Sequence, residues 1–408
     1  MPHPPKVRFL DPSTPPHIVT LVLLAGLSAA AMNIFLPSLP SMSVHFDAEY
    51  RVLQLSVTLY LAVNAVLQIF IGPLSDRLGR RPVLLWAFAL FLVFTIAIPF
   101  APNVEIFLIL RMGQAAVVAG MVLSRAIVRD MVPQDQAASM IGYVTMGMAL
   151  VPMISPVIGG LLDQAFGWQA NFVLLAILGT ATLWLVWKDV GETAGAPDRT
   201  LRDQMREAPE LLTSPRFWGY NMAATFASGA FFAYLGGAPY VGSEVFGLTP
   251  AMLGLFFGAP AIGYVAGNAT SGLYSVRYGI NAMIVTGTLV TAAGLGTSLA
   301  LFYAGYETVW VFFGFMIFVG LGNGLVIPNA IAGMLSVRPR LAGTASGLGG
   351  AMMIGGGAAL SALAAALLVP GSGAYPLLWM MFATSVLSVV AILLVVRRAR
   401  RLGLSAGA

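Results

Sequence analysis

The chain has 408 residues, of which 58% are hydrophobic and 9% charged, and its mean hydropathy is +0.87. This composition excludes a soluble domain, and the net charge of +5 does not indicate nucleic-acid binding because the basic residues are spread between apolar runs. The sequence has no cysteine, which excludes disulfides, thiolate metal sites and a cysteine nucleophile.

Twelve apolar runs are long enough to cross a bilayer as helices. The predicted spans are residues 17–40, 52–72, 82–101, 104–128, 136–162, 168–188, 216–241, 250–272, 282–304, 308–335, 341–369 and 375–396. The first run is too long for the core of a signal peptide, so we expect it to be retained. The predicted fold class is an all-α membrane protein with two pseudo-symmetric six-helix bundles.

The basic residues predict the orientation. Of the 21 Lys and Arg residues, all but Arg51, Arg111 and Arg125 lie in the two tails or in loops on the same side of the membrane. Positive residues are retained on the cytoplasmic side. Both termini are therefore predicted to be cytoplasmic, in a bacterial inner membrane.

The longest loop divides the chain. We expect a tail (1–16), a bundle (17–188), a linker (189–215), a second bundle (216–396) and a second tail (397–408). The linker is either solvated or forms a short helix on the membrane, with apolar residues on one face. Those residues are Leu201, Met205, Ala208, Leu211 and Leu212.

The link Gly72–Pro82 reads GPLSDRLGRRP and joins two spans. Gly72, Ser75, Arg77 and Gly79 recur 200 residues later as Gly272, Ser275, Arg277 and Gly279, whereas Asp76 is replaced by Val276. The link resembles the signature loop G-x-L-[SA]-D-R-x-G-R-[RK]-P of the major facilitator superfamily. The resemblance implies a conformational role for Gly72, Asp76, Arg77, Gly79, Arg80 and Arg81. The alternative is a basic loop that only sets topology.

The span 104–128 contains Arg111, Gln114 and Arg125, and Asp130 follows it. A charge facing lipid there would cost at least about 2.5–3.5 kcal/mol, so Arg111 must face a cavity or a partner. Arg111 and Gln114 resemble the R-x-x-Q-G motif associated with proton coupling, with Ala115 in place of glycine. Asp130 is expected to pair with Arg77. The alternative for Arg111 is a structural cation bonded to backbone carbonyls.

The span 136–162 contains Pro152, Pro156, Gly159 and Gly160, which predict a kinked, closely packed helix. It resembles the antiporter motif of the superfamily, with Ser155 in place of a glycine, and this resemblance favours export.

The segments AMNIFLPSLP, SRAIVRD, PNAIAGML and RLAGTASGLGG resemble the Bcr/CflA branch of drug:proton antiporters. This resemblance implies export of chloramphenicol-like and bicyclic antibiotics in exchange for protons. The branch usually has an aspartate where this chain has Asn33, and no carboxylate lies near the predicted bilayer midplane. Three alternatives follow. Proton coupling uses Asp163, Asp130 or the motif residue Arg111; or transport is not driven by protons; or Asn33 replaces a natural aspartate.

Polar, aromatic and methionine residues predict an adaptable substrate cavity. The candidates are Asn33, Tyr60, Asn64, Arg111, Gln114, Met146, Phe231, Phe232, Tyr234, Tyr264 and Asn268. An unpaired Arg111 in that cavity would favour neutral or anionic substrates. For each residue, helix packing is the alternative.

The leading hypothesis is a monomeric multidrug exporter whose partners are a small molecule, protons and the lipid bilayer. An uncoupled exporter or facilitator of a small metabolite is the second. An intramembrane enzyme is not expected because the sequence has no HExxH or GxSxG motif, and we expect no cofactor or metal.

Overall fold

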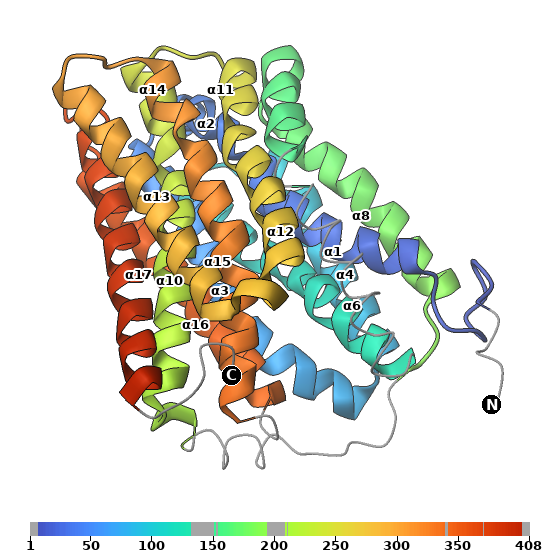
Figure 1. Cartoon of the computed structure of the whole chain (residues 1–408). Coiled ribbons are helices and arrows are strands. Elements are labelled where there is room, and N and C mark those ends of the chain that lie inside the picture. Colours follow the sequence, from blue (N-terminus) through green and yellow to red (C-terminus); the bar gives the residue numbers. More distant parts are fainter. Residues whose placement is uncertain are drawn as a thin grey trace.

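The computed structural model describes residues 7–131, 151, 154–193, 209, 211–338, 342–369 and 371–401, and every regular element in these ranges is helical (Figure 1). The first half contains α1 (Ile18–Asn33), η1 (Leu36–Ser38), α2 (Leu39–His45), α3 (Tyr50–Leu78), α4 (Arg80–Ala97), η2 (Ile98–Phe100), α5 (Val104–Gln114), η3 (Ala115–Val117), α6 (Val118–Met131), helical residues 154–166 and α8 (Gln169–Asp189). The second half contains α10 (Pro215–Tyr240), a π-helical turn (Val241–Val245), α11 (Pro250–Phe257), α12 (Ala259–Tyr278), α13 (Ile280–Tyr303), α14 (Val309–Gly314), α15 (Met316–Val337), α16 (Ala342–Leu367) and α17 (Tyr375–Arg401).

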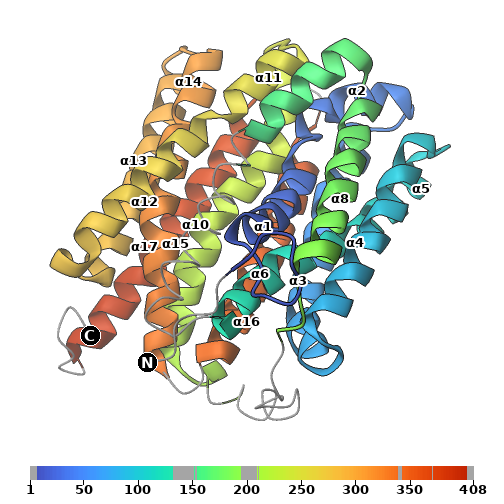
Figure 2. The same cartoon turned by 90° about the vertical axis from the view of Figure 1, so that its right-hand side faces the viewer.

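The long helices run between two ends of the molecule. Helices α2, α11 and α14 lie at one end (top in Figure 1), which we call the Pro250 end. The turns α3–α4 and α12–α13 lie at the other, which we call the Asp76 end. Figure 2 shows α12 and α13 on one side, α4, α5 and α8 on the other, and α1 and α10 between them.

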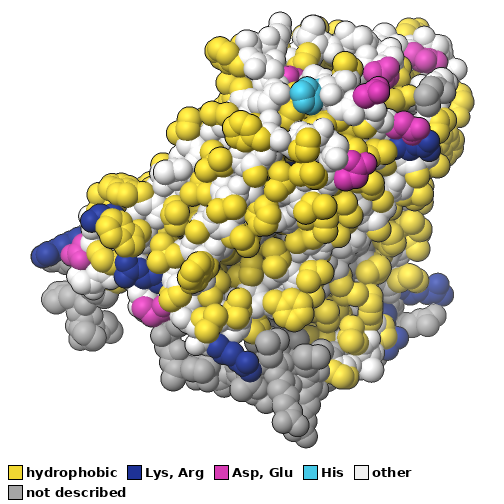
Figure 3. All heavy atoms as spheres, turned by 180° about the vertical axis from the view of Figure 1, so that it is seen from behind, with side chains coloured by type: hydrophobic (Ala, Val, Ile, Leu, Met, Phe, Trp, Pro, Cys, Tyr) yellow, Lys and Arg dark blue, Asp and Glu magenta, His cyan; other side chains and the backbone are white. Residues whose placement is uncertain are grey.

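Ten helical segments of the described residues are long and apolar enough to cross a membrane, and they match ten of the twelve predicted spans. The predicted span 136–162 lies mostly outside the described residues. Helix α10 matches the predicted span 216–241 but is less apolar than these ten segments. Nearly all of its residues from Tyr220 onward are buried between α15, α16 and α17, so this helix needs little contact with lipid. On the opposite face, hydrophobic side chains cover the middle of the molecule and charged ones gather toward its ends (Figure 3).

Several predicted spans are interrupted rather than continuous. Helix α1 ends at Asn33, and the chain continues through η1 into α2, because Pro37 and Pro40 cannot donate backbone hydrogen bonds. The 3₁₀ turn η3 separates α5 from α6, and Gly258 separates α11 from α12.

The two halves share the same turn at the Asp76 end. Gly79 has φ 95° and ψ 152°, and Gly279 has φ 82° and ψ 154°. Their backbone N–H groups donate to the carbonyls of Ser75 and Ser275 at 3.0 and 2.9 Å. A side chain would be strained at this positive φ, which explains glycine at both turns. A Cβ added at Gly72 would meet nothing within 4 Å, so in this conformation none of the described residues packs closely enough against Gly72 to require glycine there.

Candidate functional site

Arg111 is enclosed by aromatic rings of the first bundle. Its side chain is fully buried, and its Cζ lies 4.3 Å from the ring centroid of Phe35 and 4.0 Å from that of Tyr60. Nη1 donates to Oε1 of Gln114, whose Nε2 donates to Thr95 Oγ1 at 2.9 Å. Each cation–π contact is worth about 0.5–2 kcal/mol. The prediction that Arg111 faces a partner is confirmed, but the expected position on an open cavity wall is wrong in this conformation.

Asn33 is buried at the end of α1. Its Nδ2 donates to the Ala29 carbonyl at 2.7 Å, and its Oδ1 accepts no hydrogen bond from the described part of the chain. Asn33 Oδ1 is therefore a buried acceptor without a hydrogen bond from the described residues. Because asparagine does not titrate, this side chain cannot carry a proton.

The polar residues of α3 lie where the two halves meet. Gln68 Nε2 donates to Asn64 Oδ1 at 2.6 Å, and α3 packs against α16 along this stretch. A Cβ added at Gly350 of α16 would lie 3.7 Å from Gln68 Oε1. Asn64 and Gln68 thus face the other half, whereas Tyr60, one turn earlier, contacts Arg111.

Two of the three aromatic candidates on α10 pack inside the second bundle. The ring of Tyr234 is fully buried 5.1 Å from that of Phe257, and its hydroxyl donates to the Phe256 carbonyl at 3.4 Å. Phe232 is buried against Gly357. The packing alternative holds for these two rings, whereas Phe231 is partly exposed.

Arg125 lies between the halves. Its side chain is exposed on α6 and interacts electrostatically with the hydroxyl of Tyr264 on α12. Asn268, one turn along α12, donates from Nδ2 to the Tyr264 carbonyl at 2.8 Å. Met146 and Pro152 lie outside the described residues.

At the Asp76 end, Arg80 joins three helices. Its Nη1 lies 2.5 Å from Asp76 Oδ1 on α3, and its Nε lies 3.0 Å from Asp130 Oδ2 on α6. The expected partner of Asp130, Arg77, is exposed in the last turn of α3. Arg80 begins α4 after the Gly79 turn, which directs its side chain back toward α3 and α6. The predicted pairing of Asp130 with Arg77 is therefore wrong.

Sequence reasoning gave no role to Glu192, which caps the start of α4. Its Oε1 accepts from the backbone N–H of Arg80 at 2.8 Å, and its Oε2 accepts from that of Arg81 at 3.4 Å. Arg81 also donates from Nη2 to the Trp187 carbonyl at 2.8 Å. A Cβ added at Gly79 would lie 2.8 Å from Glu192 Cδ, so a side chain at this position would displace the Glu192 carboxylate from the start of α4.

At the Pro250 end, backbone contacts close the two halves against each other. A Cβ added at Gly160 would lie 2.8 Å from the carbonyl carbon of Pro250, and one added at Gly254 would lie 3.1 Å from that of Pro156. Tyr50 of α3 also donates its hydroxyl to the Gly236 carbonyl of α10 at 3.3 Å. The close packing predicted at Gly160 is confirmed.

Gly159 packs within the first half. A Cβ added there would lie 2.8 Å from the carbonyl carbon of Ile34, and it would overlap the carbonyl oxygen. The two adjacent glycines thus serve different contacts, one inside a bundle and one between bundles.

Asp163 is buried near the same end, one residue beyond the predicted span 136–162. Ser41 Oγ of α2 donates to Asp163 Oδ2 at 2.7 Å, and Asn171 Nδ2 of α8 donates to Ser38 Oγ at 2.9 Å. Burial raises the pKa of the Asp163 carboxyl, and hydrogen bonds from Ser41 and Ser38 partly offset this effect.

Sequence analysis also gave no role to Asp189, which connects the start of the chain to the end of α8 through hydrogen bonds. It accepts hydrogen bonds from the backbone of Leu10 at 2.7 Å and His17 at 2.9 Å, and from Thr20 Oγ1 at 2.6 Å. An acid at a helix end gave no signal of this role.

A profile described as "Major Facilitator Superfamily" matches residues 21–362. The chain is 28% identical over 386 residues to the uncharacterized MFS-type transporter YdgK of Bacillus subtilis, covering 91% of this chain and 93% of that one. It is 28% identical over 380 residues to the bicyclomycin resistance protein homolog of Haemophilus influenzae, covering 92% and 94%. It is 30% identical over 324 residues to the multidrug transporter MdfA of Yersinia pestis, covering 75% and 77%.

Solved structures show the same fold at low identity. The peptide transporter POT in complex with sulfate has a TM-score of 0.76 at 14% identity, covering 96% of both chains. The inward-facing, occupied bacterial homolog of the human lysosomal transporter Spinster has a TM-score of 0.71 at 16% identity, covering 94% of this chain and 96% of that one.

Proposed function

Because the chain belongs to the Major Facilitator Superfamily, we propose that it exports small amphiphilic drugs across the bacterial inner membrane by alternating access. Both termini and the Asp76 end are assigned to the cytoplasm, from the distribution of basic residues. The proposed unit is a monomer of two bundles, since each transporter of this architecture binds substrate between its own two repeats.

The contact at the Pro250 end carries this proposal. Gly160 and Gly254 bring backbone against backbone across the two halves, a contact that exists in one relative orientation of the bundles and is lost when they separate. Under the assigned topology, this contact closes the periplasmic end. The helix of residues 154–166, which contains Gly160, belongs to the predicted span that resembles the antiporter motif, and relatives named for bicyclomycin resistance and for chloramphenicol resistance support export.

The charges of the site favour neutral substrates. None of the described acids lies in the middle of a span, and Arg125 is exposed between the halves. A lipophilic cation would be repelled by the positive charge of Arg125, and none of the described acids lies at mid-membrane depth to attract it. Sequence analysis assigned the preference for neutral substrates to Arg111. Because aromatic rings enclose Arg111, we assign this preference to Arg125 instead.

Transport assays in proteoliposomes separate these substrate classes. We expect a neutral phenicol to be transported in preference to a lipophilic cation, and Arg125→Gln to reduce this preference. A stronger wild-type preference for the cation would contradict the substrate assignment.

For the coupled proton we propose Asp163. It is a buried carboxyl next to the contact between the halves, whereas Asp130 is engaged by Arg80 and the Arg111 guanidinium keeps its proton in proteins. Opening the Pro250 end would hydrate Asp163, so its affinity for a proton would change with the conformation.

An uncoupled exporter is the second candidate, because Asn33 cannot titrate and its Oδ1 has no partner in the described residues. Asn33→Asp distinguishes the two when efflux is measured against external pH. Coupling through Asp163 predicts that an uncoupler abolishes wild-type efflux and that Asp163→Asn loses its pH dependence. Wild-type efflux that survives the uncoupler, with pH dependence gained only in Asn33→Asp, would favour the uncoupled exporter.

A further inference from the structure

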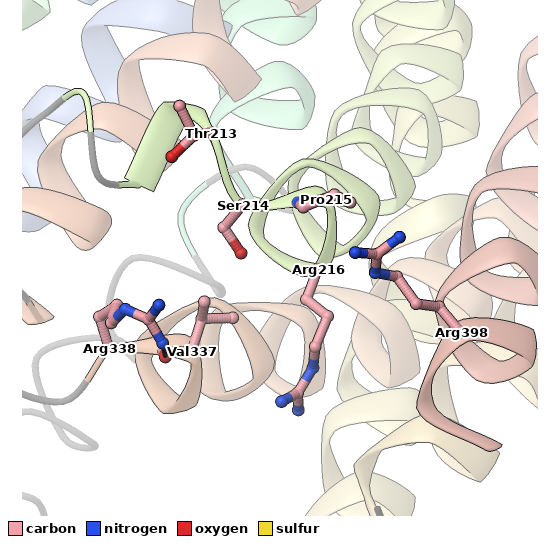
Figure 4. A pocket seen from close by; sticks show the side chains of 7 residues that line it. All are labelled: Thr213, Ser214, Pro215, Arg216, Val337, Arg338 and Arg398. Carbon is pink, nitrogen blue, oxygen red and sulfur yellow. Dashed lines mark hydrogen bonds between the residues drawn. The ribbon is translucent and has the colours of Figure 1, made fainter. Parts of the chain in front are cut away.

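Arg111 is the only buried lysine or arginine among the residues whose burial the structure describes. Its side chain is 1% exposed. It lies seven residues after Val104, where α5 begins, which is about 10 Å into the span. The arginines shown in Figure 4 are different, because Arg338 and Arg398 are exposed around a pocket of about 340 Å³ at the Asp76 end. Water can hydrate those two charges, whereas the guanidinium of Arg111 is shielded from water in this conformation.

The guanidinium of Arg111 uses one nitrogen and leaves one edge without an acceptor. Nη1 donates to Oε1 of Gln114, and Gln114 is itself fixed by its hydrogen bond to Thr95. Nε and Nη2, which share the other donor edge, donate to no group of the described residues. The rings of Phe35 and Tyr60 attract the positive charge, but a ring face accepts only weak hydrogen bonds. Two N–H groups on the same edge therefore lack an acceptor.

The positive charge of Arg111 has no acidic partner among the described residues, since none of their ion pairs includes it. The guanidinium does not give up its proton in proteins, and an unpaired charge within a span is unfavourable. The remaining acids of the chain belong to loops that the sequence predicts to be cytoplasmic, at the opposite end from the start of α5. These acids are Asp135, Asp198, Asp203, Glu207 and Glu210. An anion from outside the chain would supply the missing charge.

The hydroxyl of Tyr60 is a third donor beside the same guanidinium. The centroid of its ring lies 4.0 Å from Cζ of Arg111, and the side chain is buried. Its oxygen has no hydrogen-bond partner in the described part of the chain. Because buried donors are nearly always paired, three donors without acceptors around one buried cation indicate a ligand.

These donors fit a small anion with one negative charge and two oxygens. The Nε–Nη2 edge of a guanidinium presents two parallel N–H groups, which match the two oxygens of a carboxylate. One negative charge neutralises Arg111, whereas a divalent anion would leave an unpaired charge in apolar surroundings. The carboxylate class therefore fits this site better than a spherical halide or a divalent tetrahedral anion does.

We propose that Arg111 and Tyr60 bind a small monovalent carboxylate as a resident counterion inside the first bundle. The site is built from α3, α4 and α5, with Phe35 from the break between α1 and η1. The anion supplies the negative charge that none of the described acids supplies at this depth. The inference does not rest on drug export, because the site lies within one bundle and binding is measured without transport.

The stability of the purified full-length chain in detergent tests the proposal. Sodium formate replaces sodium gluconate at constant ionic strength, and the melting temperature gives an apparent Kd for formate. Sodium chloride and sodium sulfate are parallel probes. The test variants are Arg111→Gln and Tyr60→Phe, the second of which keeps the ring on Arg111 and removes only the hydroxyl.

Each test variant has a matched control. Arg77→Gln removes one positive charge from an exposed position, and Tyr234→Phe removes a buried hydroxyl from the second bundle. If Arg111→Gln does not fold, the comparison of Tyr60→Phe with Tyr234→Phe decides the result.

We expect saturable stabilisation of the wild type by formate. The Kd should weaken at least about tenfold in Arg111→Gln and at least about threefold in Tyr60→Phe, and change less than about twofold in the controls. Formate should bind more tightly than chloride, and sulfate should not bind at this site.

Four results would overturn the proposal. Without saturable stabilisation of the wild type by formate, water or the chain itself occupies the edge of Arg111. Equal weakening in test and control variants would place the anion elsewhere. Tighter binding of chloride than of formate would exclude the carboxylate class. Uptake of labelled formate into proteoliposomes, abolished in Arg111→Gln, would make the anion a transported substrate rather than a resident counterion.

Discussion

Gly160→Ala is expected to open the Pro250 end. The added Cβ would lie 2.8 Å from the carbonyl carbon of Pro250, whereas ordinary contacts of a Cβ begin near 3.4 Å. The opposing group is backbone and cannot rotate away, so the two halves must separate by at least about 0.6 Å at this point. Overpacking of this kind costs about 1–3 kcal/mol. Because the contact crosses between the halves, the cost applies to the closed orientation alone and shifts the equilibrium about 5- to 150-fold toward opening.

Spin labels can measure this opening because the chain has no native cysteine. Val44 on α2 and Met252 on α11 are exposed on opposite halves at the Pro250 end, so Val44→Cys with Met252→Cys reports the distance across it. We expect Gly160→Ala to move population to longer distances. Gly272→Ala is the matched control, because a Cβ there meets nothing within 4 Å. Gly159→Ala should lower the melting temperature without changing the distances, because its contact lies within the first half. If Gly160→Ala and Gly272→Ala give the same distance distribution, the proposal that the Gly160 contact closes the Pro250 end is refuted.

Three further substitutions test the remaining contacts. Arg80→Gln should destabilise the protein by about 1.5–3 kcal/mol, because it leaves two partly buried carboxylates without their cation, whereas Arg77→Gln should change stability by less than about 0.5 kcal/mol in the same thermal unfolding assay. Tyr60→Leu should lower the free energy of unfolding by about 0.5–2 kcal/mol more when Arg111 is present than in an Arg111→Met background. An equal loss in both backgrounds would contradict the stacking of Arg111 on Tyr60. Burial raises the pKa of Asp163, so the stabilisation from its protonation is complete below the ordinary value of 3.8 and is lost as the pH rises through the raised value. Asp163→Asn should therefore reduce the fall of the melting temperature as the pH rises above 3.8, and an unchanged pH profile would assign the pH dependence to another group.

The sequence predicted the fold well, because hydropathy and charge act on whole segments. Ten predicted spans correspond to apolar helices of the described residues, and the repeat was visible in the glycines of two turns that share one conformation. The breaks within spans were harder to predict, since η3 has no proline or glycine to mark it. Helix α10 shows that burial by other helices can replace the apolar surface that lipid would otherwise require.

The candidate site was predicted in part. Arg111 and Gln114 do contact each other, but the rings that enclose Arg111 come from residues as far away in sequence as Phe35. The spacing of residues along the chain cannot show which residues this far apart in sequence lie in contact. Arg77 and Arg80 have the same chemistry, and the choice between them depends on the direction in which the chain leaves the Gly79 turn.

The two ends of the molecule use different chemistry, and this difference bears on how the cycle is controlled. The Pro250 end closes through close-packed backbone, with glycines at 160 and 254 in place of charged side chains, so its strength depends on shape. The Asp76 end is ordered by the ion pairs of Arg80, whose energy depends on charge and on screening by salt. A change of ionic strength should therefore act mainly on the Asp76 end, and a change of side-chain volume mainly on the Pro250 end. Under the proposed topology, salt would therefore act on the cytoplasmic end of the transporter, while closure of the periplasmic end would depend on shape.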